Sequence, residues 1–273
     1  MKKTLTAFVT LLCGICLSAQ PQGWEWNEID RGVQWGTATL PLFHSVQSIS
    51  AARYPAAKLR TEVVNDPGKD VGGSTTTSGF GERYDALVAI NGSYFNMKTL
   101  YPATYIRDDR KQEGCTDDSE LFRVDGAFAL KGHKGKVIPV ADTLAYEKSF
   151  RRCREVMAAG PVLITGGEVL SGWPTGLSFY DKRHPRSVVG MDADGYIYYI
   201  VIDGRFPGQA DGTTVAETAE VARLFGLVDA INLDGGGSSA LWVKGVGVIS
   251  HPYDNHQFDH LGERKVPNAL IAR

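Results

Sequence analysis

The chain has 273 residues, of which 43% are hydrophobic and 22% charged, and its formal net charge is -2 at pH 7. These values exclude intrinsic disorder, which needs low hydrophobicity and a large net charge, and they provide no basic surface for nucleic acid. Glycine is abundant, with 31 residues, but far from the one residue in three of collagen.

The first twenty residues have the pattern of a secretory signal peptide. Two lysines precede a mostly apolar run from Leu5 to Leu17, and the small residues Ser18 and Ala19 follow. The run is shorter than the roughly 20 residues of a membrane-spanning helix. We therefore expect residues 1–19 to be removed and the protein to be exported, to the periplasm or the extracellular side, either free or in association with the cell envelope.

Removal of this segment leaves two cysteines, Cys115 and Cys153. Export places them in an oxidising compartment, which favours a disulfide between them, and neither belongs to a CxxC pair typical of zinc or redox sites. The sequence predicts one disulfide, worth roughly 3 to 4 kcal/mol on the chain-entropy model. Two separate thiols are the alternative.

Short segments rich in β-branched and aromatic residues recur along the chain, with turn residues between many of them. The predicted strands are 33–40, 58–64, 86–90, 122–130, 161–165, 188–192, 196–202, 230–233 and 240–243. Asp194-Gly195 between two strands is typical of a two-residue hairpin turn. The Gly/Ser/Thr-rich segment 72–81 and the charged segment 107–118 are predicted loops.

Helical signals are fewer. Thr214 and Glu217 form a capping box, apolar residues then recur near helical spacing, and Gly226 follows, which together predict a helix over 214–225. A weaker signal covers 143–152. Because strands dominate and helices are not regularly interleaved, we predict an α+β fold, a single β-rich domain of mixed sheet with a few packed helices. Residues 20–84 would supply N-terminal strands and a loop joined to a main domain over 85–273.

The most distinctive segment is 232–239, where an apolar strand runs into three glycines and two serines. Consecutive glycines tolerate positive φ, so their N–H groups could turn inward as an anion-binding nest. Asn232 and Asp234, two residues apart at the strand end, would point to one face. A glycine turn without a ligand is the alternative. The candidate anion ligands are Gly235, Gly236, Gly237, Ser238 and Ser239.

Other strand ends also carry polar or charged residues. Asp203 and Arg205 follow the strand 196–202 and offer a carboxylate and a planar guanidinium suited to phosphate. Asn91 follows another apolar run, and Arg186 and Arg264 are further candidate anion contacts.

Glu217 has two interpretations. As the third residue of its helix it is the capping-box partner of Thr214, and that role accounts for it fully. A carboxylate role in a cleft is the alternative, and the two roles are compatible.

Taken together, these segments resemble the phosphodiester glycosidase family. The resemblance covers most of the chain from about residue 85 onward and is most specific over 201–241. The matching stretches are NGSYF at 91–95, AGPVLI at 159–164, HPRSVVGMDADG at 184–195, VIDGR at 201–205, TVAETAEVARLFGLVDAINLDGGGSSAL at 214–241 and ERKVPNAL at 263–270.

The resemblance implies a hydrolase that cleaves the bond between a sugar anomeric carbon, of an N-acetylglucosamine-like sugar, and a phosphodiester. Arg186, Arg205 and the segment 235–239 would surround the phosphate. One carboxylate would activate water or stabilise an oxocarbenium-like transition state. The candidates for it are Asp203, Glu217 and Asp234, and the family motif favours a cleft role for Glu217.

We expect no cofactor and no metal, and a sugar phosphodiester or phosphorylated glycan as the binding partner, with the oligomeric state open. Two other functions stay possible from the residues alone. A metal-dependent phosphodiesterase would need clustered ligands, and the six histidines form no HxH or HExxH pattern. A non-catalytic glycan-binding module would need an exposed aromatic platform, for which Trp173 and the run 196–199 are candidates.

Overall fold

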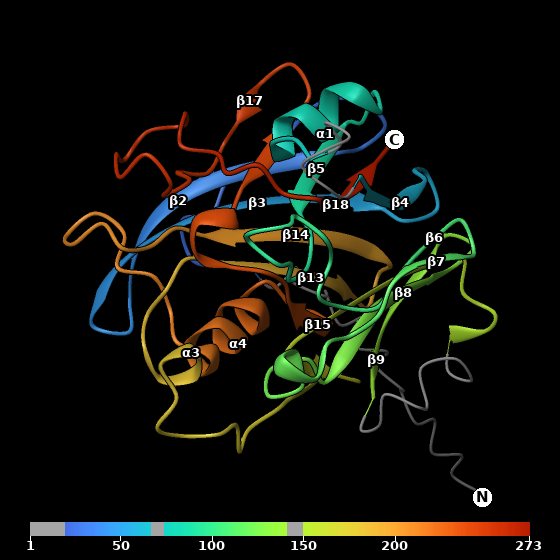
Figure 1. Cartoon of the computed structure of the whole chain (residues 1–273). Coiled ribbons are helices and arrows are strands. Elements are labelled where there is room, and N and C mark those ends of the chain that lie inside the picture. The colour runs from blue at the N-terminus through green and yellow to red at the C-terminus, as the bar shows by residue number, and fades with distance from the viewer. Residues whose placement is uncertain (1–19, 67–73, 141–149) are drawn as a thin grey trace, which may run out of the picture.

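The computed structural model describes residues 20–66, 74–140 and 150–273, which form three β-sheets with a few short helices (Figure 1). The strands of the largest sheet are β1 (Asn27–Glu28), β2 (Gln34–Leu42), β3 (Ser45–Pro55), β11 (Val162–Thr165), β12 (Glu168–Val169), β13 (Arg186–Asp192), β14 (Tyr196–Ile202) and β15 (Leu227–Asn232). Their order across the sheet is β1-β2-β3-β14-β13-β15-β11-β12.

Two five-stranded sheets complete the β structure, with the orders β7-β6-β10-β8-β9 and β17-β16-β5-β18-β4. The first contains β6 (Ile106–Asp108), β7 (Lys111–Gly114), β8 (Gly126–Lys131), β9 (Lys134–Pro139) and β10 (Glu155–Ala159). The second contains β4 (Thr61–Asn65), β5 (Val88–Asn91), β16 (Leu241–Val243), β17 (Gly247–Val248) and β18 (Asn268–Ala272). The helices are α1 (Thr77–Arg83), α3 (Ser178–Asp181), α4 (Val215–Leu224) and short 3-10 turns at Asp118–Glu120 and Gly236–Ser238.

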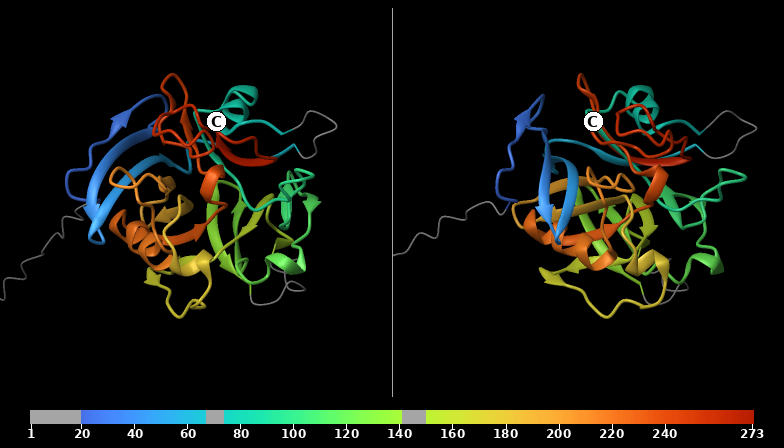
Figure 2. Two further views of the ribbon diagram at one scale, coloured as in Figure 1. Left: turned by 60° about the vertical axis from the view of Figure 1, so that its left-hand side comes forward. Right: turned by 90° about the vertical axis from the view of Figure 1, so that its left-hand side faces the viewer.

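Strand β14 shows why the central part of the large sheet is so apolar. Alternate residues, such as Tyr199 and Val201, pack into a core shared with the two smaller sheets. The intervening residues, such as Ile200, pack against α4 on the opposite face. Figures 1 and 2 show α3 and α4 on one side of this sheet and β8 and β9 on the other. Both faces of β14 are therefore buried, which a continuous apolar run permits.

The predicted helix over 214–225 is confirmed as α4, and the predicted hairpin turn at Asp194-Gly195 joins β13 to β14. Thr214 caps the helix through the predicted capping box with Glu217. Gly195 adopts φ +83°, a conformation that glycine reaches without strain.

The prediction of a mixed sheet is wrong, because every strand pair among the described residues is antiparallel. The connection through α4 does bring β15 back parallel to β14, as a helical crossover does. However, β13 lies between these two strands and is antiparallel to both. The class is therefore β-rich, with three α-helices in the described part of the chain.

The N-terminal strands belong to the same sheets as the rest of the chain, since β3 pairs with β14 and β4 pairs with β18. Two predicted loops are wrong in part. The segment 72–81 ends in helix α1, because Thr76 Oγ1 accepts the Gly79 N–H at 3.1 Å and Phe80 is fully buried. The segment 107–118 contains the hairpin of β6 and β7 in spite of its charge.

The predicted disulfide is absent, and both cysteines are free thiols. Cys115 is exposed, and its Sγ accepts a hydrogen bond from Gln112 Nε2 at 3.0 Å. Cys153 is buried in an apolar cluster with Val156, and this burial raises the pKa of its thiol. The two side chains therefore lie in different environments. The positions of two cysteines in a sequence do not show whether their side chains can meet.

Two predictions fall outside the described residues. The signal peptide covers residues 1–19, and most of the weaker helix lies within 141–149. In the part of the chain that the structure describes, no helix is both long and apolar enough to cross a membrane.

Candidate active site

The topology of the large sheet brings three distant segments to one edge. Because β14 and β15 run in the same direction with β13 antiparallel between them, the ends of β14 and β15 meet the start of β13. The segments 203–205, 233–239 and 184–187 therefore lie side by side. Backbone bonds join two of them, from Leu233 N to Ser187 O at 2.8 Å and from Gly236 N to Pro185 O at 2.9 Å.

A pocket of about 340 Å³ opens at this edge. Among its lining residues, Asp234 is the only carboxylate, and it faces four arginines. The lining residues are Arg123, Phe179, His184, Pro185, Arg186, Arg205, Asp234, Gly235, Gly236, Gly237 and Arg264. An excess of fixed positive charge around one carboxylate is suited to an anionic ligand.

Asp234 is partly buried, and its Oδ1 accepts the Gly235 N–H at 3.0 Å. Burial raises the pKa of Asp234 above the ordinary aspartate value, although neighbouring groups act to lower it. The opposing groups are the Ser238 hydroxyl, the guanidinium groups of Arg123 and Arg264, and the Gly235 N–H. A carboxylate with a raised pKa is a stronger base than an exposed one once it is ionised.

Arg186 is the most rigidly held of the four arginines, with only 2% of its surface exposed. Its Nε donates to Thr213 O at 3.0 Å, and its Nη2 donates to the carbonyl oxygens of Phe179 at 2.7 Å and Lys182 at 3.3 Å. Its Nη1 has no hydrogen-bond partner within the described residues. Burial lowers the pKa of Arg186 to about 10, so the side chain is still a cation at neutral pH.

Arg205 is exposed and adopts φ +67°. Its Nη2 lies 3.3 Å from His184 Nδ1, and His184 Nε2 lies 3.2 Å from Ser178 O. Burial, together with the charges of Arg186 and Arg205, lowers the pKa of His184. A neutral His184 can therefore accept from Arg205 on one ring nitrogen and donate to Ser178 on the other.

The remaining two arginines are paired with carboxylates. Arg264 forms an ion pair with Asp254, and Arg123 forms one with Glu120 and lies 3.8 Å from the ring centroid of Tyr94. Arg186 and Arg205, by contrast, form no ion pair with a carboxylate in the described residues. The unpaired positive charge of the pocket is thus concentrated on these two arginines.

The glycine segment does not form the predicted nest of inward-turned N–H groups. Four of the five N–H groups of residues 235–239 already have acceptors within the protein, and only Gly237 N–H lacks one among the described residues. The acceptors are Asp234 Oδ1 and the carbonyl oxygens of Pro185, Gly235 and Gly236. Contact of Ser238 and Ser239 with a ligand stays a prediction, and both residues are buried.

Glycine is needed here for close approach instead. A Cβ atom on Gly237 would collide with the Asp254 carboxylate and the Arg264 guanidinium. A Cβ atom on Gly235 would lie 2.6 Å from Pro185 O, which is closer than real contacts of this kind. The glycines therefore let Arg264 and the start of β13 pack directly against the backbone that carries Asp234.

Asp203 lies outside the pocket lining and is only 1% exposed. Its Oδ2 accepts from Ser48 Oγ at 2.6 Å and lies 2.8 Å from His251 Nδ1, while its Oδ1 accepts the His251 N–H at 2.8 Å. Both oxygens are thus occupied. Asp203 fastens the loop that begins at His251 to the end of β14, and its catalytic role stays a prediction.

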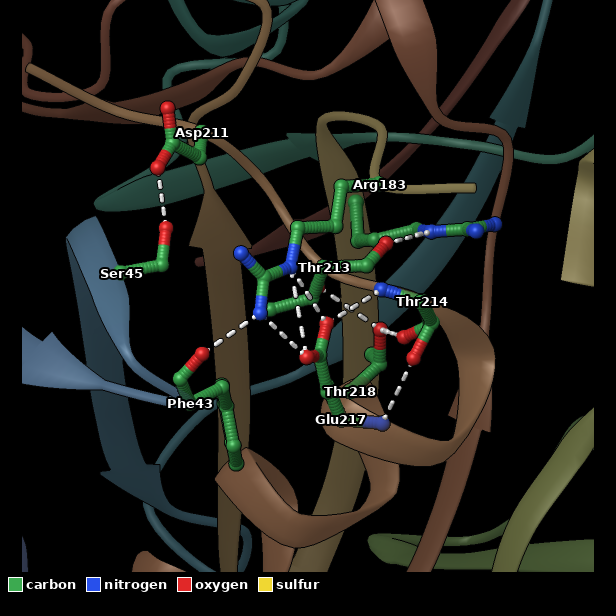
Figure 3. A network of polar contacts seen from close by, with 9 residues as sticks. Phe43, Ser45, Arg183, Asp211, Thr213, Thr214, Glu217 and Thr218 are labelled. Carbon is green, nitrogen blue, oxygen red and sulfur yellow. Dashed lines mark hydrogen bonds and ion pairs between the residues drawn. The ribbon is translucent and has the colours of Figure 1, made fainter. Parts of the chain in front are cut away.

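Glu217 is likewise outside the pocket lining, in the network of Figure 3. Arg183 donates to its carboxylate from Nε at 3.0 and 3.2 Å and from Nη2 at 2.6 Å, and Thr214 N–H donates to Oε2 at 3.0 Å. Arg183 Nη2 also donates to Phe43 O at 2.7 Å. The geometry shows the capping role and links α4 to the end of β2, while a role in the chemistry stays a prediction.

The two candidate asparagines are buried and support the backbone of the site. Asn91 Nδ2 donates to Asp234 O at 2.7 Å, and its Oδ1 accepts from Ser187 Oγ at 2.6 Å. Asn232 Nδ2 donates to Gly160 O at 2.9 Å and to the Tyr94 hydroxyl at 3.0 Å. Asn91 therefore helps to hold Asp234 in position.

The sequence interpretation did not include Arg123 or Phe179. Both reach the pocket from segments outside the large sheet, and neither has a neighbouring motif that distinguishes it. Phe179 lies in the short helix α3, and its ring packs edge-on against Phe122 at 5.9 Å. Only the tertiary arrangement shows that these residues belong to the site.

The structure also bears on the two alternative functions, a glycan-binding module and a metal-dependent phosphodiesterase. Tyr198 and Tyr199 are almost fully buried and Trp173 packs against the core, so they form no exposed aromatic platform. In residues 20–66, 74–140 and 150–273, no group of three or more His, Cys, Asp or Glu side chains is placed to hold a metal ion.

Comparison with known proteins relates this site to a family. The family model for phosphodiester glycosidases matches residues 84–273. A curated relative, the SPbeta prophage-derived uncharacterized protein YomE of Bacillus subtilis (strain 168), is 26% identical over 189 residues. That match covers 66% of this chain but only 28% of YomE, so the chain spans less than a third of this relative.

Two solved structures share the fold. A hypothetical protein from Synechocystis has a TM-score of 0.72 and 14% identity, with 91% of this chain and 63% of that protein covered, so just under two thirds of it is matched. The zebrafish N-acetylglucosamine-1-phosphodiester alpha-N-acetylglucosaminidase catalytic domain, auto-inhibited by its pro-peptide, has a TM-score of 0.68 and 18% identity. That match covers 93% of this chain and 86% of the zebrafish domain.

Proposed function

Because the chain belongs to the phosphodiester glycosidase family, we propose that it hydrolyses the bond between a sugar anomeric carbon and a phosphodiester. The observation that carries this proposal is the pocket at the edge of the large sheet, where a single carboxylate, Asp234, faces four arginines. The zebrafish enzyme with the same fold acts, by its name, on N-acetylglucosamine-1-phosphodiesters. An N-acetylglucosamine-like sugar is therefore the first substrate to test.

The arginines suit the charge change in this reaction. Cleavage of the bond between the anomeric carbon and oxygen transfers the bonding electrons to that oxygen, so the phosphodiester departs as a phosphomonoester with additional negative charge. A phosphate is already a good leaving group, so the site needs anion stabilisation more than it needs a general acid. Arg186 and Arg205, which lack carboxylate partners within the described residues, are placed to supply it.

We assign the carboxylate role to Asp234. As a carboxylate it would activate the attacking water or stabilise the positive charge that develops on the sugar ring. Asp203 and Glu217, the other candidates, have both oxygens occupied by hydrogen bonds within the protein. Asp234, by comparison, has one hydrogen bond from the protein backbone and faces the pocket.

A kinetic comparison tests this function. The mature protein and the variant Asp234→Asn are incubated with N-acetylglucosamine-1-phosphodiesters and related sugar phosphodiesters. We expect turnover by the wild type and a loss in kcat of roughly 10²- to 10⁴-fold in the variant. Asp229→Asn, in the strand β15 that leads to Asp234 but away from the pocket lining, is the matched control and should retain activity. Absence of turnover with every substrate, or full activity of Asp234→Asn, would overturn the proposal.

Chelation distinguishes the metal-dependent alternative. Since the proposed mechanism uses only side chains of the chain, EDTA should leave the rate unchanged. A loss of activity that a divalent cation restores would favour a metal-dependent phosphodiesterase.

The predicted signal peptide adds the proposal that this activity is exported. Cell fractionation followed by N-terminal sequencing should find the protein outside the cytoplasm with residues 1–19 removed. A cytoplasmic, uncleaved protein would contradict it.

A further inference from the structure

Large apolar side chains that are exposed are concentrated around the pocket. With one exception among the residues that the structure describes, they belong to four segments next to it: 96–101, 120–123, 177–179 and 253–264. These residues are Met97, Tyr101, Leu121, Phe122, Leu177 and Leu261, which are 42% to 84% exposed. The exception is Val246, which is 44% exposed at the turn between β16 and β17. Such a grouping of apolar side chains marks an interaction site more often than chance exposure.

Specific contacts connect these side chains to the pocket lining. Met97 Sδ lies 3.7 Å from Nη1 of Arg264. The guanidinium of Arg123 lies 5.3 Å from the ring centroid of Phe122. Leu177 is at the start of α3, two residues before Phe179, which lines the pocket. Met97, Phe122 and Leu177 therefore form an apolar rim beside a polar centre.

The charged side chains also differ between the apolar rim and the polar centre. At the rim, the positive charges of Arg123 and Arg264 are neutralised by their ion pairs with carboxylates. At the centre, Arg186 and Arg205 have no such partner within the described residues. The surface thus has its unpaired arginines at the centre and apolar side chains beside them, which complements a molecule with an anionic group next to an apolar one.

We propose that the rim binds the alcohol on the far side of the phosphate, and that this alcohol is aliphatic. This rests on the proposed function, in which the central arginines hold the phosphodiester. A group attached to the second ester oxygen then leaves the pocket over the rim. The substrate class is a sugar phosphodiester of a long aliphatic alcohol, whose carbon chain lies on Phe122, Leu177 and Met97.

A series of alkyl esters tests the rim. The methyl, butyl and octyl phosphodiesters of N-acetylglucosamine 1-phosphate are compared below their micelle concentrations. Burial of each methylene should raise kcat/KM by about two- to fourfold until the rim is covered. The variants Leu177→Ser and Phe122→Ser should flatten this dependence, so that the ratio of kcat/KM for the octyl ester to that for the methyl ester falls. Val246→Ser removes a side chain of nearly the same exposure away from the pocket and should keep the wild-type dependence.

Binding measurements separate a failure of this inference from a failure of the proposed function. The affinities of methyl and octyl phosphate for wild type and Leu177→Ser, measured by calorimetry, need no turnover. If octyl phosphate binds no tighter than methyl phosphate, or if Leu177→Ser and Val246→Ser behave alike, the rim does not bind an alkyl chain, even where the methyl ester is hydrolysed. If no ester is hydrolysed, the glycosidase function fails, and tighter binding of octyl phosphate would still support the apolar rim.

Discussion

Substitution of Glu217 by alanine separates a capping role from a catalytic role. The change removes the side-chain half of the capping box, worth about 1 kcal/mol. It also removes the ion pair with Arg183. The Arg183 side chain is 31% exposed and the Glu217 side chain 19%, and an ion pair with this exposure contributes about 1 kcal/mol. The sum is about 2 kcal/mol, which for a domain of this size lowers Tm by roughly 4 to 8 °C.

Thermal unfolding and kinetics of the same preparations provide the assay. Glu217→Gln retains an oxygen that can accept the Thr214 N–H but loses the charge, so about half of the destabilisation should remain. Both variants should keep kcat within about threefold of the wild type at 25 °C, since no contact with the pocket lining is lost. A kcat at least 100-fold lower in Glu217→Gln with an unchanged Tm would refute this reasoning and place Glu217 in the chemistry.

The contribution of Glu217 to the free energy of unfolding should also depend on pH, in a direction that follows from its pKa. Burial raises the pKa of Glu217, but the hydrogen bonds from Arg183 and Thr214 outweigh it, so the net result is a pKa below the ordinary value of 4.5. Its contribution to stability is therefore present above pH 4.5 and is lost as the pH falls through the lower pKa of the folded state. The difference in stability between wild type and Glu217→Gln should shrink below pH 4.5.

Three further predictions follow from individual contacts. Arg205→Gln removes an unpaired guanidinium from the pocket and should lower kcat/KM by about 10- to 100-fold with little change in Tm. Arg31→Gln, at another exposed arginine with positive φ, is its control. Gly237→Ala should displace Arg264 and reduce activity, and unchanged kinetics would show that this contact is dispensable. Burial raises the pKa of Glu155 from 4.5 to about 7, so its stabilising effect is complete below pH 4.5 and is lost as the pH rises through about 7. Glu155→Gln should therefore be more stable than wild type at pH 8 in a denaturant titration, by about 2 to 3 kcal/mol, and equal stability there would contradict this.

Local signals in the sequence account for the parts of the fold that local chemistry determines. The capping box at Thr214 and the Asp194-Gly195 turn depend on neighbouring residues and are visible without tertiary structure. Strand β3 was not predicted, because its serines and alanines have weak strand propensity. Its place between β2 and β14 overrides that propensity.

In the site, too, some residues could be identified from local sequence and others depend on tertiary packing. The segments that end β14 and β15 could be identified from their sequence, because glycines and charged residues follow apolar runs there. Arg123 could not, since only packing against Tyr94 brings it to the pocket. The direction of the N–H groups in residues 235–239 also depends on partners elsewhere, such as Pro185 O. The orientation of two cysteines, which decides whether they can bond, is likewise absent from their spacing.

The bond that is broken tests the central claim most directly. Hydrolysis of an N-acetylglucosamine-1-phosphodiester in oxygen-18 water, followed by mass spectrometry of both products, shows where water adds. Attack at the anomeric carbon predicts the label in the sugar and none in the phosphomonoester. Label in the phosphate would show cleavage of a phosphorus–oxygen bond and would contradict the assignment of this pocket to glycosyl transfer to water.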